Sequence, residues 1–457
     1  MTSVPSHRRP LNGNNVLFIL LFFSLVIASC STSTEIVRPE RDTTTKTNPK
    51  KRPADTKVDT VQWTEVASEE FKPIEYDGTP RIEKEAMYRA ALMVPFNSAE
   101  YNRGENSGED ERFIQFYAGM KIGLEKLESE NIPLVLDVFD TQGSESTLRS
   151  KLRMINDDTH LIIGPYERDP LKIAAQRAKD DEIPLVSPWL SSARIAENNP
   201  FYLQLRPTLR DHYDKMVEEA LKKFNADQII ILKQEDGSDD NRVKYLQEVG
   251  RSVLRADQNP FREYSVNRDS LILGEFYFSD LFDENRETVF LIQNYSFDDE
   301  DFIYNTLRKL SAAKGLRSTT IYGLPILLDT EKIDFNLYKI LNVKVVRSRF
   351  VDPTRSDVID FKQRFFSEFG ALPSDEAYYG HDIITYFGKA LKKYGKQFQF
   401  FLDQHNEDLL QINFDIQKSY LREGTVSDDF RDINYFVNKH LDIIEFDENR
   451  FKVAEKY

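Results

Sequence analysis

Two loops between residues 160 and 192 carry polar and aromatic side chains that could bind a small molecule. Each follows a short apolar run, HLIIGPYERD and IPLVSPWLSS, and an amphipathic segment at 170–179 separates them. This pattern predicts a strand, a helix and a second strand, which places both loops at the carboxyl edge of a parallel sheet. Open α/β folds bind ligands at that edge. The candidate binding residues in the two loops are Tyr166, Arg168, Asp169, Trp189 and Ser191.

The sequence offers no constellation of residues that is typical of an enzyme. It contains no Walker A, GxGxxG, HExxH or GxSxG motif, and its six histidines are scattered. His381 and Asp382 are adjacent in YYGHDIITYFG. Neighbouring residues on a helix point about 100° apart, however, so the two are not placed to act together as a base and the group that orients it. We therefore predict a protein that is not an enzyme and that uses no metal and no cofactor.

Apolar runs and amphipathic segments alternate along most of the chain. Strands are predicted at 88–95, 132–139, 161–163, 183–186 and 201–205, with helices at 112–127, 146–155 and 170–179. The pattern then restarts, with strands at 228–232, 270–277, 288–293, 318–322 and 343–350 and helices at 211–224, 241–254, 299–313, 356–369 and 376–394. The alternation predicts parallel doubly wound sheets in two lobes. The last fifty residues alternate apolar and polar side chains, which indicates antiparallel strands.

Composition and charge restrict the class of partner. The chain has 457 residues, of which 40% are hydrophobic and 30% charged, so it can bury the cores of two lobes. Its formal net charge is −15, and removal of residues 1–29, which hold two basic residues and no acidic one, would leave −17. Attraction to phosphate needs clustered lysine and arginine, so nucleic acid is excluded as a partner.

The amino terminus has the pattern of a lipoprotein signal. Arg8 and Arg9 precede an apolar run at 16–28, which ends in LVIASC and resembles the bacterial lipobox. We predict a signal peptide over residues 1–29, lipid on Cys30, and a disordered tether over residues 30–80 that is rich in Thr, Ser, Lys and Pro. The acyl chains would attach the protein to the cell envelope. Ser31 after the cysteine favours the outer membrane, facing the periplasm.

The order of motifs resembles the type I periplasmic binding proteins, the leucine/isoleucine/valine-binding family. The matching pieces are YRAALMVPF, FYAGMKIGLEKL, IIGPY, IPLVSPW, the RPT at 206–208 and FKQRFFSEFGALPSDEAYYGHDIITYFGKAL. They span about residues 87–400, and the chain is similar also to the penicillin-binding-protein activator lipoproteins. The resemblance implies two lobes joined by hinge strands near 206–207 and 343. Lobe 1 would comprise residues 81–207 and 345–400, and lobe 2 residues 208–344 and 401–457.

The resemblance also implies a ligand site in the cleft between the lobes. Amino-acid-binding members hold the α-carboxylate with hydroxyl and backbone N–H groups of two loops, which correspond here to 168–169 and 190–191. Ser191 keeps a hydroxyl, whereas Arg168 and Asp169 replace the usual serine, and Tyr166 and Trp189 are bulky additions. An arginine can pair bidentately with a carboxylate, although Glu167 and Asp169 beside it would oppose an anion. Tyr295 is the candidate from lobe 2.

Two functions fit these observations. The first is a lipid-anchored binding protein for an amino acid or another small polar ligand, similar to the substrate-binding proteins of ABC transporters. The second is a regulatory lipoprotein that interacts with an envelope protein, such as a peptidoglycan synthase, and activates it. Ser191 and the intact alternation of strands and helices favour the first. The long tether and the altered loop at 168–169 favour the second.

Overall fold

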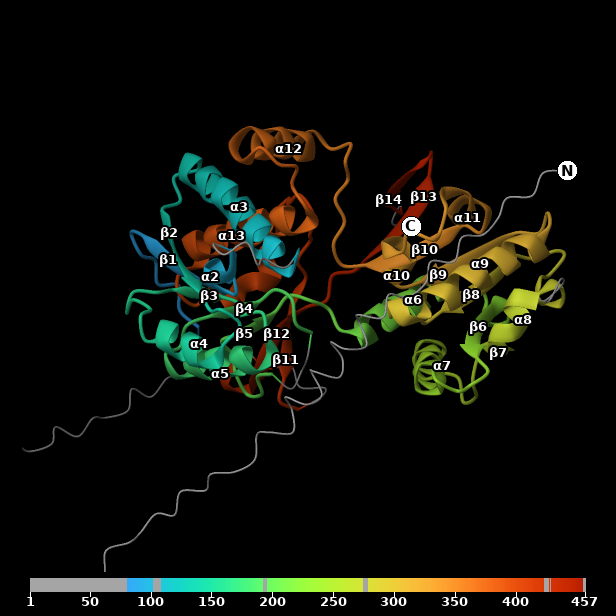
Figure 1. Cartoon of the computed structure of the whole chain (residues 1–457). Coiled ribbons are helices and arrows are strands. Elements are labelled where there is room, and N and C mark those ends of the chain that lie inside the picture. The colour runs from blue at the N-terminus through green and yellow to red at the C-terminus, as the bar shows by residue number, and fades with distance from the viewer. Residues whose placement is uncertain are drawn as a thin grey trace, which may run out of the picture. The chain divides into compact units, whose positions relative to one another are not determined.

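The computed structural model describes residues 80–454, apart from 102–107, 192–194, 274–277, 423–426 and 428. The predicted signal peptide, Cys30 and nearly all of the predicted tether lie outside these ranges. Within them, two seven-stranded sheets with helices on their faces form two lobes (Figure 1). This confirms the predicted fold class. No helix in these ranges is long and apolar enough to cross a membrane.

Lobe 1 is built on a sheet in the order β11-β12-β5-β4-β3-β1-β2. All its neighbouring strands are parallel except β11 and β12. The strands are β1 (Tyr88–Val94), β2 (Leu134–Asp140), β3 (Leu161–Ile163), β4 (Leu185–Ser187), β5 (Tyr202–Gln204), β11 (Ile416–Tyr420) and β12 (Ile433–Asn438). The helices are α2 (Ser98–Tyr101), α3 (Gly108–Ser129), α4 (Glu145–Leu152), α5 (Arg168–Asp180), α12 (Ser356–Phe369), α13 (Asp375–Tyr394) and the short 3-10 helices η4 (Phe398–Gln404) and η5 (Phe430–Asp432).

Helices cover both faces of the lobe 1 sheet. On one face α3 and α13 pack against Leu92 and Ile163. On the other, α4 and α5 pack against Met93 and Ile162. The central strands are therefore buried on both sides, which explains why they are short, continuously apolar runs in the sequence.

The two long helices of lobe 1, α3 and α13, touch through glycines. A Cβ atom on Gly119 would lie 1.8 Å from the carbonyl oxygen of Ala377, and one on Gly380 would lie 2.0 Å from the carbonyl oxygen of Phe116. Only glycine permits backbones to approach this closely. Because α13 is buried on nearly every side, this contact fixes the positions of the amino-terminal turns of both helices.

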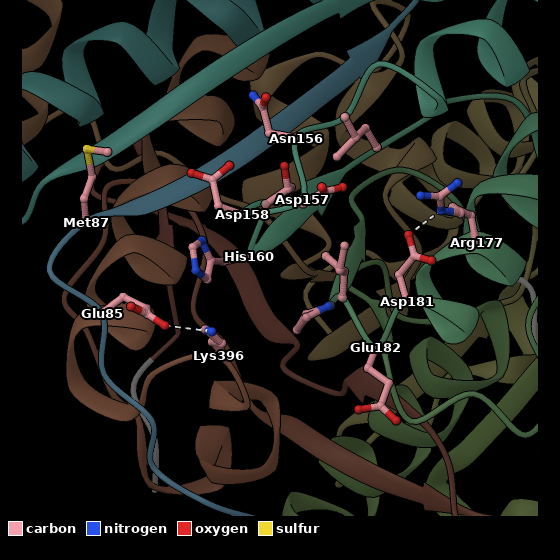
Figure 2. A pocket seen from close by; sticks show the side chains of 14 residues that line it. Glu85, Met87, Asn156, Asp157, Asp158, His160, Arg177, Asp181, Glu182 and Lys396 are labelled. Carbon is pink, nitrogen blue, oxygen red and sulfur yellow. Dashed lines mark hydrogen bonds and ion pairs between the residues drawn. The ribbon is translucent and has the colours of Figure 1, made fainter. Parts of the chain in front are cut away.

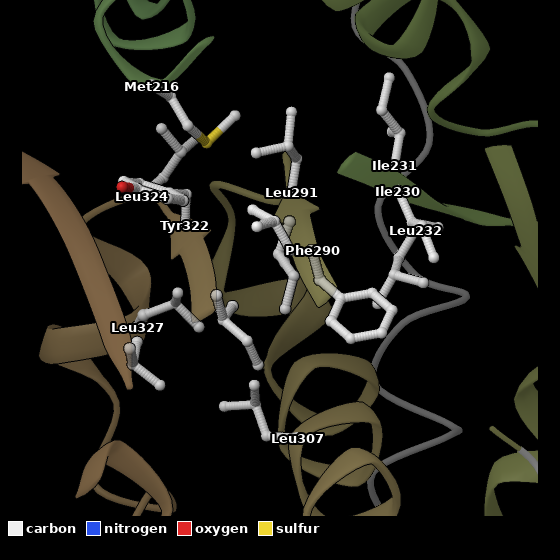
Figure 3. Packing of buried hydrophobic residues seen from close by; sticks show 14 of the residues in the cluster. Met216, Ile230, Ile231, Leu232, Phe290, Leu291, Leu307, Tyr322, Leu324 and Leu327 are labelled. Carbon is white, nitrogen blue, oxygen red and sulfur yellow. The ribbon is translucent and has the colours of Figure 1, made fainter. Parts of the chain in front are cut away.

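Lobe 2 is built on a sheet in the order β14-β13-β10-β9-β8-β6-β7, with β13 antiparallel to both its neighbours. The strands are β6 (Ile229–Gln234), β7 (Arg262–Val266), β8 (Thr288–Ile292), β9 (Thr319–Gly323), β10 (Val343–Arg347), β13 (Asp442–Asp447) and β14 (Arg450–Val453). The helices are α6 (Leu209–Lys223), α7 (Asp240–Leu254), α8 (Arg268–Leu273), α9 (Glu300–Lys314), α10 (Ile326–Asp329), α11 (Phe335–Ile340) and the 3-10 turns η1 (Ala226–Gln228), η2 (Ser279–Leu281) and η3 (Phe297–Asp299). Figure 3 shows its core, with Met216 of α6 and Leu307 of α9 on opposite sides of the strands.

The predicted strand at 270–277 is wrong over its described residues. Residues 268–273 form helix α8, and the strand of this region is β7, which lies earlier in the chain. The apolar run that starts at Leu271 suggested a strand, but a short apolar run does not distinguish a strand from a buried helix. β7 is an edge strand with exposed Arg262 and Glu263, so its sequence lacks the apolar signal of a central strand.

The chain passes from one sheet to the other three times within the described residues, after β5, after β10 and after β12. The second crossing follows Arg347 rather than Val343, because β10 pairs with β9 and β13 in lobe 2. The third corrects the assignment of 401–457 to lobe 2. η4, β11 and β12 belong to lobe 1, where β12 pairs with β5, and only β13 and β14 join lobe 2. Alternating side chains reveal a strand but not its partner.

Asp140 at the end of β2 holds the loop that follows β1. Its carboxylate accepts hydrogen bonds from the backbone N–H groups of Asn97, Ser98 and Gln142, at 3.0–3.2 Å, and from the Ser98 hydroxyl at 2.8 Å. Burial alone would raise the pKa of Asp140, but these hydrogen bonds outweigh burial and hold the pKa below its usual value. The Asp140 carboxylate is therefore ionised at neutral pH and stabilises the loop after β1 at the carboxyl edge of the lobe 1 sheet.

Candidate functional site

A cavity of about 290 Å³ lies at the carboxyl edge of the lobe 1 sheet, beside the segments that cross to lobe 2. Its lining residues come from the start of α3, the loop after β4, the first and second crossings, the α10 region, α13 and residue 412. They are Arg112, Pro188, Trp189, Leu205, Arg206, Pro325, Asp329, Arg347, Ser348, Arg349, Tyr379 and Ile412. This is the edge at which the sequence predicted a binding site, and the volume is near the lower end of the range for ligand pockets.

Glu376, in the first turn of α13, organises the polar groups of this cavity. Its Oε1 accepts hydrogen bonds from Arg112 at 3.3 Å and from Arg349 at 3.4 and 3.5 Å. Its Oε2 accepts a hydrogen bond from the indole Nε1 of Trp189 at 3.0 Å. The Glu376 side chain is only 12% exposed, so these interactions are weakly screened by water. One carboxylate thus ties together two arginines and the tryptophan.

Aromatic rings form the wall behind these charges. Trp189 packs edge-on against Tyr166, with ring centroids 5.7 Å apart, and against Phe113 at 5.5 Å. The Arg112 guanidinium lies 4.8 Å from the centroid of the Tyr166 ring and also donates a hydrogen bond to the Tyr166 hydroxyl at 3.2 Å. The Tyr166 ring therefore holds Arg112 by cation–π contact, and it packs against Trp189 of the other loop.

The crossing segments contribute the other two arginines of the lining. Arg347 donates hydrogen bonds to Asp329 at 2.8 Å and to the carbonyl of Arg349 at 2.9 Å. Arg206 donates to the carbonyl of Trp189 at 3.3 Å. The Arg349 guanidinium lies 4.5 Å from the centroid of the Tyr379 ring. Guanidinium groups present planar pairs of N–H donors, which match the geometry of carboxylate and phosphate groups.

Asp382 anchors the segment that closes one side of the cavity. It is fully buried, and its carboxylate accepts the backbone N–H groups of Leu410, Gln411 and Ile412 at 2.7–3.2 Å. The Nδ1 of His381 lies 3.0 Å from the same carboxylate. His381 and Asp382 are therefore in contact although they are adjacent on a helix. Because the carboxylate already accepts three backbone hydrogen bonds, we assign the pair a structural role.

The structure brings together two of the six predicted binding residues. Trp189 lines the cavity, and Tyr166 contacts it through Arg112. Arg168 is exposed at the start of α5, and Asp169 pairs with Lys172 at 3.1 Å on the same helix. Ser191 is half-buried and Tyr295 is 53% exposed, and neither is among the residues that line the cavity. Glu167 is half-buried, and burial raises the pKa of its carboxyl group.

Sequence reasoning missed Arg112, Arg347, Arg349 and Glu376. A signal for two of them exists in VRSRF, where arginines two residues apart follow a buried strand at a lobe crossing. Glu376 resembles an ordinary acidic residue in the first turn of a helix. Nothing in the sequence links it to Arg112, because the two are 264 residues apart.

The matching edge of lobe 2 carries a buried polar network. Asp239 accepts hydrogen bonds from the backbone N–H of Gln234 at 3.0 Å and from the Gln293 side chain at 2.5 Å. Burial raises the pKa of Asp239 above its usual value. Tyr295 lies just beyond this network, with the Arg242 guanidinium 5.6 Å from the centroid of its ring. Asp239 is thus held by Gln234 at the end of β6 and by Gln293 just after β8.

A larger cavity of about 770 Å³ lies at the opposite edge of the lobe 1 sheet (Figure 2). Its lining residues include Met87, His160 and Pro184, which precede β1, β3 and β4, so it is at the amino ends of the strands. Figure 2 shows the ion pair between Glu85 and Lys396, 2.7 Å apart, at its rim. Open α/β folds bind ligands at the carboxyl ends, so the smaller cavity is the better candidate. No cluster of three or more His, Cys, Asp or Glu among the described residues has the arrangement of a metal site.

Comparison with known proteins finds one partial family match. Residues 124–262 match the family described as receptor family ligand binding region. No curated protein sequence matches the chain.

Three solved structures with similar folds are informative. A protein from Rhodospirillum rubrum named as a branched-chain amino acid ABC transporter has a TM-score of 0.56 and 12% identity, over 80% of this chain and 100% of that one. An ABC transporter substrate-binding protein from Desulfitobacterium hafniense has a TM-score of 0.50 and 13% identity, over the same shares. Full-length LpoA from Haemophilus influenzae has a TM-score of 0.51 and 8% identity, over 82% of this chain and 60% of that one. The two lobes, the three crossings and these similarities together show that the chain has the type I periplasmic-binding-protein fold.

Proposed function

We propose that this chain is a lipid-anchored binding protein of the cell envelope that holds a small polar ligand, such as an amino acid, in the cavity of about 290 Å³. The observation that carries the proposal is the lining of that cavity, where polar side chains from α3 and from two crossing segments converge at the carboxyl edge of a parallel sheet. The amino acid transporter and substrate-binding protein with similar folds support it. Trp189 would form part of the wall, with Tyr166 packed behind it. The roles of Arg168, Asp169, Ser191 and Tyr295 stay predictions.

A regulatory lipoprotein that activates an envelope enzyme, such as a peptidoglycan synthase, is the second candidate. The specific observation in its favour is the edge-on packing of Tyr166 against Trp189. The two rings come from the two loops that, by the resemblance to amino-acid-binding proteins, would hold the ligand. The fold similarity to LpoA supports it as well. A tether of fifty residues with an r.m.s. span of roughly 40 Å would let the lobes reach a partner away from the membrane.

Binding can be tested on the full-length protein in detergent by thermal unfolding in the presence of amino acids, short peptides and small organic acids. A compound at 100 times its Kd stabilises the folded state by about 2.7 kcal/mol, which visibly raises the Tm. Under the first candidate at least one compound raises the Tm. If no compound does so and the protein instead co-purifies with a synthase, the small-ligand proposal is wrong and the regulatory candidate is supported.

Anchoring is expected to depend on one residue. Cys30→Ala removes the only thiol and therefore the only site for the lipid, so the protein should move from the membrane fraction to the soluble fraction. Ser33→Ala, a short way along the tether, serves as the matched control and should stay with the membrane. Fractionation followed by mass spectrometry of the amino-terminal peptide measures both effects. Retention of the Cys30→Ala variant in the membrane would contradict the lipid anchor.

A further inference from the structure

The cavity that we propose as the ligand site is positively charged in a chain that is strongly negative. Its lining contains four arginines, Arg112, Arg206, Arg347 and Arg349, and a single carboxylate, that of Asp329. The whole chain carries a formal net charge of −15. A cavity lined by charges of one sign attracts ligands of the opposite sign, so this cavity favours anions although the chain as a whole is negative.

The carboxylates next to the cavity do not balance these arginines. Glu376 is shared between Arg112 and Arg349, through hydrogen bonds of 3.3–3.5 Å that are long for charged partners. Arg347 pairs with Asp329 at 2.8 Å and, more loosely, with Asp375 at 3.7 Å. Three carboxylates therefore face four guanidinium groups, and the Arg112–Glu376–Arg349 arrangement leaves N–H donors of both arginines available.

Of the four arginines that line the cavity, Arg206 is the one for which the described residues provide no carboxylate partner. Its hydrogen bond goes to the carbonyl of Trp189 at 3.3 Å, and the side chain is exposed at the first crossing. A zwitterionic ligand would also need a free carboxylate for its ammonium group. Glu376, Asp329 and Asp375, the three carboxylates that face the arginines, are already paired with them.

We infer that the cavity selects a small anion, a carboxylate or phosphate compound, and that Arg206 together with Arg349 holds its anionic group. This inference rests on the proposed binding function and narrows the class of ligand. Trp189 is a lining residue whose backbone carbonyl accepts the hydrogen bond from Arg206, so the bound compound lies next to a tryptophan. The volume of about 290 Å³ restricts it to a small metabolite.

The test uses fluorescence of Trp189 in the full-length protein in detergent. The chain has two tryptophans, Trp63 and Trp189, so a Trp63→Phe variant reports on the cavity alone. Citrate, inorganic phosphate and L-leucine serve as probes for a carboxylate, a phosphate and a zwitterion. Citrate or phosphate is expected to change the emission saturably, with an affinity that falls as NaCl is raised. Which of the two binds more tightly identifies the anionic group.

Substitutions locate the binding. Arg206→Gln and Arg349→Gln are each expected to weaken the binding of the anion by about tenfold or more, because each removes charged hydrogen bonds. Arg210→Gln, which removes an exposed arginine that packs on Tyr245 instead, is the matched control and should leave affinity unchanged. If Arg349→Gln lowers the Tm so far that the variant cannot be titrated, Arg206→Gln alone is compared with the control, because Arg206 is exposed and its substitution should not affect folding.

The outcomes separate this inference from the proposed function. Saturable binding of L-leucine without binding of either anion overturns the anion inference and leaves the binding function standing. Anion binding that neither arginine substitution weakens places the anion elsewhere and also overturns the inference. Failure of these probes and of every compound in the thermal screen rejects both.

Discussion

Gly119→Ala and Gly380→Ala should each lower the free energy of unfolding of lobe 1 by about 2–3 kcal/mol, although glycine to alanine on an exposed helix is worth about 1 kcal/mol of stabilisation. The sign reverses because the new Cβ atoms would lie 1.8 and 2.0 Å from backbone carbonyl oxygens of the facing helix. A backbone oxygen cannot move away by changing a rotamer. The helices α3 and α13 must therefore separate.

The measurement is urea unfolding of the full-length protein, followed by far-UV circular dichroism and by emission of Trp189 in the Trp63→Phe background. Ser367→Ala on the exposed side of α12 is the matched control, with an expected change within about 0.5 kcal/mol. Because one separation of the helices relieves both clashes, the double variant should lose less than the sum of the single losses. Single variants as stable as the wild type would contradict the close contact of the two helices.

The glycine contact also explains how packing builds the site. Arg112 lies in the second turn of α3 and Glu376 at the start of α13, and their hydrogen bond of 3.3 Å depends on the distance between these helices. A separation forced by Gly380→Ala should therefore loosen the pair and shift the emission of Trp189 toward that of an exposed tryptophan. The packing of the two helices and the geometry of the cavity should therefore both change in the Gly380→Ala variant.

Local patterns in the sequence were sufficient for most of the fold. The runs at 161–163 and 183–186 predicted β3 and β4, and the amphipathic segment at 356–369 coincides with α12. Each of these elements reveals itself within a few residues, through the period of its apolar side chains. The prediction failed where a partner far along the chain decides the outcome. β12 lies in lobe 1 because it pairs with β5, and its Asn438 donates to the carbonyl of Leu205, 233 residues earlier.

The same reasoning separates the predictable part of the site from the rest. Trp189 and Tyr166 follow strands directly, so the edge of the sheet that carries them could be inferred. The charge of the cavity depends on Arg112, Arg349 and Glu376, which three distant segments bring together. The sequence also assigned the anionic contact to Arg168, which the structure leaves exposed on α5. Arg168 could be proposed because it lies in the predicted loop. The arginines of the crossing segments could be identified only from the folded structure.

Glu376→Gln is expected to lower the free energy of unfolding by about 2 kcal/mol. The substitution keeps the shape of the side chain and one acceptor oxygen, but it leaves Arg112 and Arg349 facing each other without a negative charge. Removing one partner from a buried ion pair costs about 3–5 kcal/mol. The loss should be smaller here because the two arginine side chains are 31% and 30% exposed, which lets water screen them.

Glu368→Gln is the matched control, since Glu368 pairs with Lys121 at 3.1 Å on the surface, and its loss should be at most about 1 kcal/mol. Added acetate distinguishes lost charge from lost shape. At equal ionic strength, acetate in place of chloride should raise the Tm of Glu376→Gln more than that of the wild type, because a carboxylate from solution can occupy the position between the two guanidinium groups. A variant that is destabilised but gains nothing from acetate would show that the carboxylate of Glu376 acts through packing, and that the arginines around it do not form an anion site.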